Sequence, residues 1–324
     1  MKGKAAVLKE TGKFIVETRE VNCGDDEVLI RVAVCGLCNW EKGFFTGGLP
    51  IAPDSTLGHE WAGTVVETGK DVTGFAYGDK VTVLPVDLEG FAEYAKVKAE
   101  RCFKLADGID IHEAFMEPLK CVVTVCRGAQ PEAGDFGVVI GCGPMGLWCV
   151  QALSGHLLSG LIVIDIDDNK LKMAKEFGAT HTINSKECDA AARIAEITNG
   201  HMADFVIEGT GVPALVPSTA SYLKASRGRV VLMSYYEQES KSFDWKPFSD
   251  KGAIILNPHP AFSEDQLDDA RRAVELINNR TFRHDGMISH KFTLDEVQKA
   301  FETLSAKPAD FIKGVVICDA QCTE

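Results

Sequence analysis

Short apolar runs separated by glycine- and proline-rich turns dominate the first third of the chain. Within these runs the apolar residues either alternate with polar ones or stand together, and both patterns are typical of short strands. The expected strands are Ala5–Leu8, Lys13–Glu17, Val28–Cys35, Gly63–Glu67 and Lys80–Leu84. The pattern therefore predicts an irregular, β-rich unit at the start of the chain.

From about residue 120 onward the pattern changes, and short β-branched runs alternate with apolar positions at helical spacing. The expected strands are Gly137–Ile140, Leu161–Ile164, Phe205–Ile207 and Val230–Met233. The expected helices are Met145–Gly155, Asn169–Phe177, Asp189–Thr198 and Pro213–Ala225. Strand and helix in regular alternation predict a parallel, doubly wound sheet.

After the predicted parallel sheet, the regular alternation of strand and helix ends. The remaining residues predict two amphipathic helices and a last strand at Gly314–Cys318. We therefore predict an α/β protein in which residues 123–257 form a nucleotide-binding type of domain. Residues 1–122 and 258–324 would form the β-rich domain that it interrupts. An apolar strand at Ala253–Leu256 is expected at the edge of the parallel sheet, where it would pair two copies of the chain.

Composition narrows the class of protein. Hydrophobic residues make up 45% and charged residues 25% of the 324 positions, which excludes disorder as the main state. The net charge of −13 disfavours nucleic acid and anionic membranes as partners. The uncharged stretch from Phe136 to Ile164 is long enough to cross a bilayer, but its glycines favour a buried strand–helix–strand unit. With no secretory signal and 11 cysteines, we expect a cytoplasmic protein with free thiols.

A glycine fingerprint follows the first strand of the predicted parallel sheet. Gly141, Gly143 and Gly146 have the G-x-G-x-x-G spacing that allows a tight turn, close approach of a pyrophosphate and close packing of helix on strand. Asp165 ends the next strand, where a carboxylate binds ribose hydroxyls and repels the 2′-phosphate of NADP. The pattern predicts NAD as cofactor. The expected contacts are Gly141, Gly143, Pro144, Met145, Gly146, Asp165 and Lys170.

A structural alternative exists for this fingerprint, in which the glycines close a turn and Asp165 caps the helix that begins near Asn169. Asp167 or Asp168 can provide that cap equally well, so the helix does not require Asp165. The complete context of strand, glycines, helix, strand and carboxylate favours dinucleotide binding.

Metal-ligating residue types gather in the β-rich part. Cys38, His59, Glu60 and Glu117 offer the thiolate, imidazole and carboxylate groups of a catalytic zinc site. Each also has a structural alternative: a core thiol, a turn histidine or a helix cap. Cys35 and Cys38 have the spacing of half a structural zinc site, but no second C-x-x-C completes it. The spacing alone does not decide between metal ligands and purely structural residues.

The order of several motifs along the chain favours the metal site over the structural roles. It runs Cys35–Cys38, Leu57–Gly63, Gly78–Val81, Gly90–Tyr94, Glu117–Leu119 and then the glycine fingerprint. The chain thereby resembles the zinc-containing medium-chain dehydrogenase/reductase superfamily, that of the alcohol dehydrogenases, nearest the sorbitol (polyol) dehydrogenase branch. The resemblance implies a GroES-like catalytic domain around a Rossmann domain, and a homodimer or homotetramer. It implies that Cys38 and His59 bind zinc, with Glu117 third, directly or through water, and Glu60 as adjacent or alternate ligand.

Two departures from the family pattern affect the expected site. Residues 82–89 lack the four cysteines that would hold a structural zinc, so one catalytic zinc per chain is expected. Trp40 stands where the family has the serine or threonine that starts a proton relay. Glu41 is expected to orient a zinc ligand. In an extended segment its side chain would point away from Trp40, which would then form an apolar wall or stack on a sugar ring.

These patterns predict an NAD-dependent zinc oxidoreductase acting on a secondary alcohol or ketone of a small polar substrate, such as a sugar, polyol or cyclitol. Zinc would act as a Lewis acid on the substrate oxygen. The expected catalytic group is Cys38, His59, Glu60, Trp40 and Glu41. One alternative is reduction of an imine or a conjugated C=C bond. Another is a catalytically inactive NAD(H)-binding sensor, which the intact set of metal ligands disfavours.

Overall fold

The computed structural model describes residues 1–236 and 243–319, and its chain forms two compact units. The first unit comprises Met1–Pro118 and Ala270–Glu324, and the second comprises Leu119–Asp269. The chain passes from the first to the second inside helix α2 (Glu117–Ala129) and returns inside helix α8 (Gln266–Asn278). The domain boundaries expected near residues 122 and 258 stay predictions.

The first unit is built on two sheets. A small antiparallel sheet has the strand order β2-β1-β4, and a larger sheet has the order β15-β16-β3-β5-β6-β8, with β7 also paired to β3. The small sheet contains β1 (Lys2–Glu10), β2 (Lys13–Glu20) and β4 (Ser55–Thr56). The larger contains β3 (Glu27–Gly36), β5 (Trp61–Thr68), β6 (Lys80–Val83), β7 (Tyr94–Lys98), β8 (Cys102–Lys104), β15 (Ile288–Thr293) and β16 (Lys313–Ile317). The β-rich first unit is as the sequence predicts, although several strands run longer.

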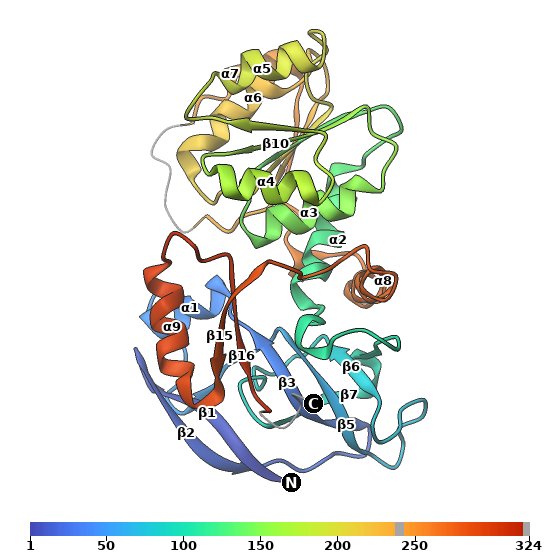
Figure 1. Ribbon diagram of the computed structural model, residues 1–324, viewed down its shortest axis with the longest axis vertical. Coiled ribbons are helices and arrows are strands. Elements are labelled where there is room, and N and C mark those ends of the chain that lie inside the picture. Colours follow the sequence, from blue (N-terminus) through green and yellow to red (C-terminus); the bar gives the residue numbers. More distant parts are fainter. Residues whose placement is uncertain (237–242, 320–324) are drawn as a thin grey trace. The chain divides into compact units, whose positions relative to one another are not determined.

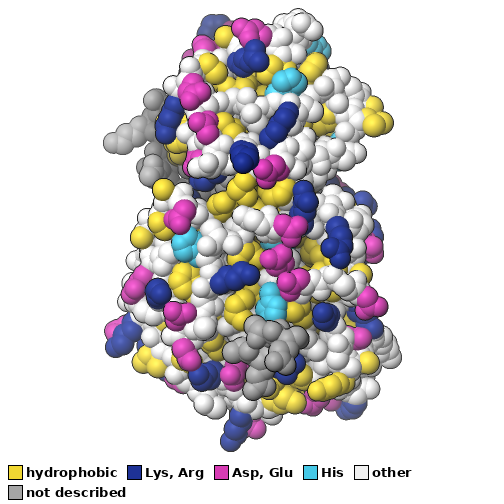
Figure 2. Space-filling model, viewed as in Figure 1, with side chains coloured by type: hydrophobic (Ala, Val, Ile, Leu, Met, Phe, Trp, Pro, Cys, Tyr) yellow, Lys and Arg dark blue, Asp and Glu magenta, His cyan; other side chains and the backbone are white. Residues whose placement is uncertain are grey.

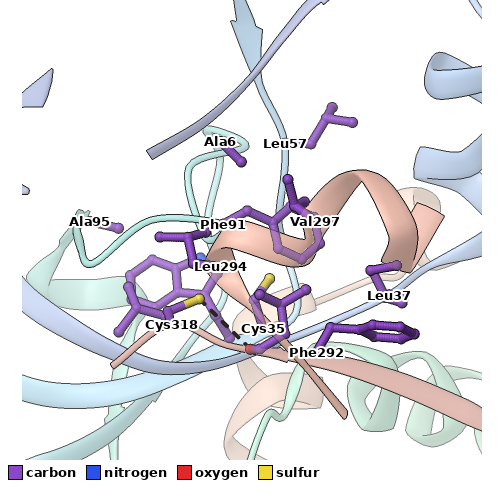
Figure 3. Close-up of a cluster of buried hydrophobic side chains, with 14 of the residues drawn as sticks. Ala6, Cys35, Leu37, Leu57, Phe91, Ala95, Phe292, Leu294, Val297 and Cys318 are labelled. Atoms are coloured by element: carbon purple, nitrogen blue, oxygen red, sulfur yellow. Dashed lines mark hydrogen bonds between the residues drawn. The ribbon is translucent and has the colours of Figure 1, made fainter. Parts of the chain in front are cut away.

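Helix α9 (Val297–Ala306) closes the core of this unit. Its Phe301 is fully buried and contacts the rings of Phe14, Phe45 and Phe91. Figure 3 shows Phe91 among other side chains of this core, which come from distant parts of the sequence. Helix α1 (Asn39–Thr46) supplies Phe45, so this packing also fixes the helix that follows Cys38.

The second unit contains a six-stranded sheet whose neighbouring strands are all parallel, in the order β11-β10-β9-β12-β13-β14. Its strands are β9 (Phe136–Ile140), β10 (Gly160–Asp165), β11 (His181–Asn184), β12 (Phe205–Glu208), β13 (Arg229–Leu232) and β14 (Ile254–Leu256). Its helices after α2 are α3 (Pro144–Ser154), α4 (Asp168–Glu176), α5 (Ala190–Ile197), α6 (Thr219–Tyr222) and α7 (Lys246–Lys251). Figure 1 shows α3 and α4 on one face of this sheet and α5, α6 and α7 on the other. The predicted doubly wound sheet is confirmed, and its order reverses between β9 and β12.

Single elements differ from the sequence prediction. The helix expected at Pro213–Ala225 is a 3₁₀ helix, η3 (Pro213–Ser218), followed by the short α6. Pro217 lies inside it and has no N–H to donate, so a continuous α-helix is disfavoured there. The uncharged stretch at 136–164 is β9, α3 and β10, as predicted, and none of the helices in the described residues is long and apolar enough to cross a membrane.

The remaining elements are short 3₁₀ turns: η1 (Ala99–Arg101), η2 (Ile111–Glu113), η4 (Pro260–Phe262) and η5 (Leu294–Glu296). The side chains on the face shown in Figure 2 carry both signs of charge side by side. Ten cysteines fall within the described residues, and all of them are free thiols.

Candidate metal centre and cofactor crevice

The candidate metal ligands Cys38, His59 and Glu60 come together in the first unit. Cys38 is the residue before α1, and His59 and Glu60 come directly before β5. One ligand atom from each lies within 4.8 Å of the others. Gly58 makes this approach possible, since its φ is +108° and a Cβ there would meet the backbone N of Phe91 at 2.5 Å. The local backbone thus brings the thiolate, the imidazole and one carboxylate to one place.

The ring of His59 is oriented by Glu41. Its Nδ1 lies 3.0 Å from Oε1 of Glu41, a fully buried side chain that also accepts a hydrogen bond of 2.6 Å from the backbone N–H of Gly58. Nε2 of the same ring faces Oε2 of Glu117, the first residue of α2, at 3.7 Å. With a carboxylate beside Nδ1, Nε2 is the ring nitrogen that can face a metal. Three of the predicted ligands therefore form one cluster, and Glu117 lies next to its imidazole.

The electrostatics of this cluster favour a cation. Burial by itself lowers the pKa of His59, but the charges of Glu41 and Cys38 and the hydrogen bonds to both outweigh burial and raise it well above its ordinary value. The negative charges of Glu41 and Cys38 that stabilise a proton on this imidazole would also attract a dication. Thiolate, imidazole and carboxylate are zinc ligands, so the residues fit zinc.

A buried lysine that was not predicted from the sequence forms an ion pair with Glu60. Lys313, the first residue of β16, is 4% exposed, and its Nζ donates to Oε2 of Glu60 at 2.5 Å and to the carbonyl of Leu37 at 2.9 Å. Gly36 leaves room for the Glu60 carboxylate, because a Cβ at position 36 would lie 2.1 Å from Oε2 of Glu60. The sequence signal for this residue is a lysine directly before the predicted strand Gly314–Cys318; in the structure the strand begins at Lys313 itself.

Trp40 lies beside the candidate metal ligands, and its backbone is helical rather than extended. It belongs to α1, where successive side chains point about 100° apart, so Trp40 and Glu41 still diverge. Glu41 is fully buried, whereas Trp40 is 46% exposed. The indole packs edge-on against His59 at 5.4 Å and Phe44 at 4.8 Å between ring centroids. An aromatic surface therefore replaces a hydroxyl next to the candidate metal.

The glycine fingerprint of the second unit fits a dinucleotide. Gly141 has φ +94°, and a Cβ on Gly146 would lie 1.9 Å from the carbonyl oxygen of Gly141, so both positions need glycine. A Cβ on Gly143 would meet nothing within 4 Å, which leaves open space beside the backbone. Helix α3 begins with Pro144 and Met145, and helix N-termini of this kind bind phosphate.

Asp165 ends β10 beside this turn. Its carboxylate accepts hydrogen bonds from the backbone N–H groups of Cys142 at 2.5 Å, Ile166 at 2.7 Å and Asp167 at 3.0 Å. Helix α4, with Lys170 in its first turn, is capped by Asp167, so the alternative in which Asp165 is its cap is wrong. Asp165 is thus fixed next to the fingerprint, where a ribose-binding carboxylate belongs.

Comparison with known proteins supports both halves of this description. The model of the alcohol dehydrogenase GroES-like domain matches residues 24–107, and that of the zinc-binding dehydrogenase matches residues 144–259. Sorbitol dehydrogenase of Bacillus subtilis (strain 168) is 30% identical over 92% of this chain and 92% of its own length. Erythritol/L-threitol dehydrogenase of Mycolicibacterium smegmatis is 30% identical over 86% of this chain and 88% of its own.

Among solved structures, a zinc-binding dehydrogenase of Sinorhizobium meliloti 1021 bound to NADP aligns with a TM-score of 0.86 and 27% identity, over 98% of this chain and 99% of its own. The fold and the site thus define a zinc-type dehydrogenase with a nicotinamide cofactor. The chain belongs to the zinc-containing medium-chain alcohol dehydrogenase superfamily, near its polyol dehydrogenase branch.

Proposed function

We propose that the protein is an NAD-dependent, zinc-dependent dehydrogenase of a small polyol, sugar or cyclitol, acting on a secondary hydroxyl or the corresponding ketone. The observation that carries the proposal is the convergence of Cys38, His59 and Glu60, with the imidazole oriented by Glu41. The polyol dehydrogenases among the relatives support the substrate class.

Cys38, His59 through Nε2, and Glu117, directly or through water, are the proposed zinc ligands. When bound, zinc would supply Lewis acidity that lowers the pKa of a substrate hydroxyl, and a nicotinamide cofactor would supply the hydride-transfer chemistry. Glu41 holds the imidazole in the tautomer and orientation that binding requires. Because residues 82–89 contain no cysteine, we propose one zinc per chain and no structural zinc.

Trp40 shapes the substrate side of this centre. Its half-exposed indole offers an apolar face against which the C–H side of a sugar or cyclitol ring can stack. It has no hydroxyl to pass on a proton, so we propose that the proton leaves through substrate hydroxyls or solvent.

Asp165 sets the preference for NAD. Its carboxylate is fixed by three backbone N–H groups, and it would bind the ribose hydroxyls and repel a 2′-phosphate. We further propose a cytoplasmic homodimer or homotetramer that pairs through β14, the edge of the parallel sheet in the described residues. Free thiols are the form that a reducing compartment maintains.

One observation favours a second candidate. Reduction of an imine or a conjugated C=C bond needs no deprotonation of an alcohol, and Trp40 removes the hydroxyl that would serve that step. The two candidates share the metal centre and the cofactor crevice, and they differ in the bond that is reduced.

The test is a panel of polyols, cyclitols and sugar phosphates with NAD, read by the absorbance of NADH, beside imines and enones with NADH. Turnover of a polyol or cyclitol supports the primary proposal, and turnover of imines or enones alone supports the second. Stoichiometric quenching of NADH fluorescence without turnover on either panel would indicate a sensor and contradict both.

A further inference from the structure

A second carboxylate at the cofactor crevice has no part in the function proposed above. Glu208 ends β12 and is fully buried. Its Oε1 accepts hydrogen bonds from the backbone N–H of Thr210, at 2.9 Å, and from the Thr210 hydroxyl, and its Oε2 accepts one from the Tyr236 hydroxyl. This one side chain therefore joins the loop after β12 to the loop after β13.

Glu208 also shapes the loop that it begins. The Thr210 oxygen that donates to Glu208 accepts a hydrogen bond of 3.1 Å from the backbone N–H of Val212. Gly211 between them has φ +72°, so this turn depends on glycine as well as on the side-chain bonds. The buried carboxylate of Glu208 therefore fixes the start of the loop after β12, and the same carboxylate binds Tyr236.

The two loops lie on one side of the point where the strand order reverses. β9 leads to the glycine fingerprint, and its neighbour β10 ends at Asp165, the proposed partner of the adenosine ribose. On the other side of β9 are β12 and β13. Because a dinucleotide lies across such a reversal with one half on each side, the nicotinamide half belongs over the carboxyl ends of β12 and β13.

We propose that the hydrogen bond between Tyr236 and Glu208 is a clamp that holds these two loops in the arrangement that binds the nicotinamide half of the cofactor. Glu208 and Tyr236 are then positioning residues for the cofactor. This inference rests on the proposed dinucleotide site, and it adds two residues that act on one half of the ligand only.

The chemistry of the pair suits a permanent clamp. Burial, followed by the hydrogen bond to Glu208 and its charge, raises the pKa of Tyr236, so the phenol keeps its proton and remains a donor near neutral pH. A hydrogen bond from a hydroxyl to a buried carboxylate is among the stronger ones in proteins. The neighbouring Tyr235 is 66% exposed and provides a matched control in the same loop.

The test compares two ligands that share the adenosine half. Affinities for NADH, by fluorescence, and for ADP-ribose, by calorimetry, would be measured for the full chain and for Tyr236→Phe, Glu208→Gln and Tyr235→Phe. We expect Tyr236→Phe and Glu208→Gln to weaken NADH binding about tenfold, equivalent to about 1.4 kcal/mol. Binding of ADP-ribose should stay within about twofold of the parent protein. Tyr235→Phe should change neither affinity.

Unchanged NADH binding in Tyr236→Phe would overturn the clamp. Equal weakening of NADH and ADP-ribose would also overturn it, since the pair would then support the whole unit rather than one half of the site. Failure of the parent protein to bind either ligand would instead overturn the proposed dinucleotide site itself. Tyr236→Phe removes only the hydroxyl and should fold, so the proposal can still be tested if Glu208→Gln does not fold.

Discussion

Removal of the Lys313 side-chain charge is the perturbation whose magnitude the structure defines best. Lys313 and Glu60 are 4% and 2% exposed, and Nζ and Oε2 lie 2.5 Å apart. Burial lowers the pKa of Lys313, but the charges of Glu60 and Cys38 and the hydrogen bond to Glu60 outweigh it, so the pKa is raised and the ammonium stays charged. Lys313→Met therefore leaves Glu60 as a buried carboxylate without that ammonium.

Loss of one partner from a buried ion pair costs about 3–5 kcal/mol. At about 2–4 °C per kcal/mol for a unit of this size, the melting temperature of the metal-free protein should fall by about 6–20 °C. The measurement is scanning calorimetry with a chelator present. Lys299→Met is the matched control, because its pair with Glu296 is exposed and its loss should leave the melting temperature nearly unchanged.

The melting temperature of Lys313→Met in the presence of zinc gives a second measurement. If Glu60, released from Lys313, turns to the metal as an alternate ligand, zinc should raise the melting temperature of Lys313→Met more than that of the parent protein. A change below about 1 kcal/mol in the metal-free variant would refute the argument, because the pair would then behave as an exposed one.

Three further predictions concern the cofactor, the substrate and acid stability. The parent protein should prefer NAD over NADP by roughly a hundredfold in kcat/KM, and Asp165→Ala should reduce that preference mainly by weakening NAD; a parent preference for NADP would contradict it. Trp40→Ser should raise KM without raising kcat in steady-state assays, whereas a large rise in kcat would show that the missing hydroxyl limits turnover. Burial raises the pKa of Asp204, but hydrogen bonds from Lys224 and the backbone N–H of Phe136 outweigh it and leave the pKa below its ordinary value. The resulting stability is present above the ordinary carboxyl pKa of about 3.9 and is lost as the pH falls through the lowered value. Urea unfolding between about pH 6 and about pH 3 should therefore show a shallower acid loss for Asp204→Asn, and parallel curves would contradict this.

The strand, turn and helix that carry the candidate cofactor site were predictable because their signals are local. Gly141, Gly143 and Gly146 serve one turn, and Asp165 follows at the end of the next strand, so a short window contains the whole unit. The local pattern failed at η3, where Pro217 disfavours the α-helix that the apolar spacing suggests.

The candidate metal centre was predictable only in part, because its contacts join distant segments. Cys38 and His59 were identified from the order of motifs, and the structure brings both together with Glu60. Lys313 stands far from Glu60 in the sequence, and no spacing rule connects them. The pairing of β3 with both β16 and β5 brings them together. The bond from Tyr236 to Glu208 is of the same kind, since it depends on the neighbouring positions of β12 and β13.

The most direct test of the central claim measures zinc content and dehydrogenase activity on the same samples. The account predicts about one zinc per chain, loss of polyol oxidation after exhaustive chelation, and its return when zinc is added back. Cys38→Ala and His59→Ala should each lose zinc and activity while circular dichroism shows a folded protein. Two zincs per chain, or full activity after chelation, would contradict the account.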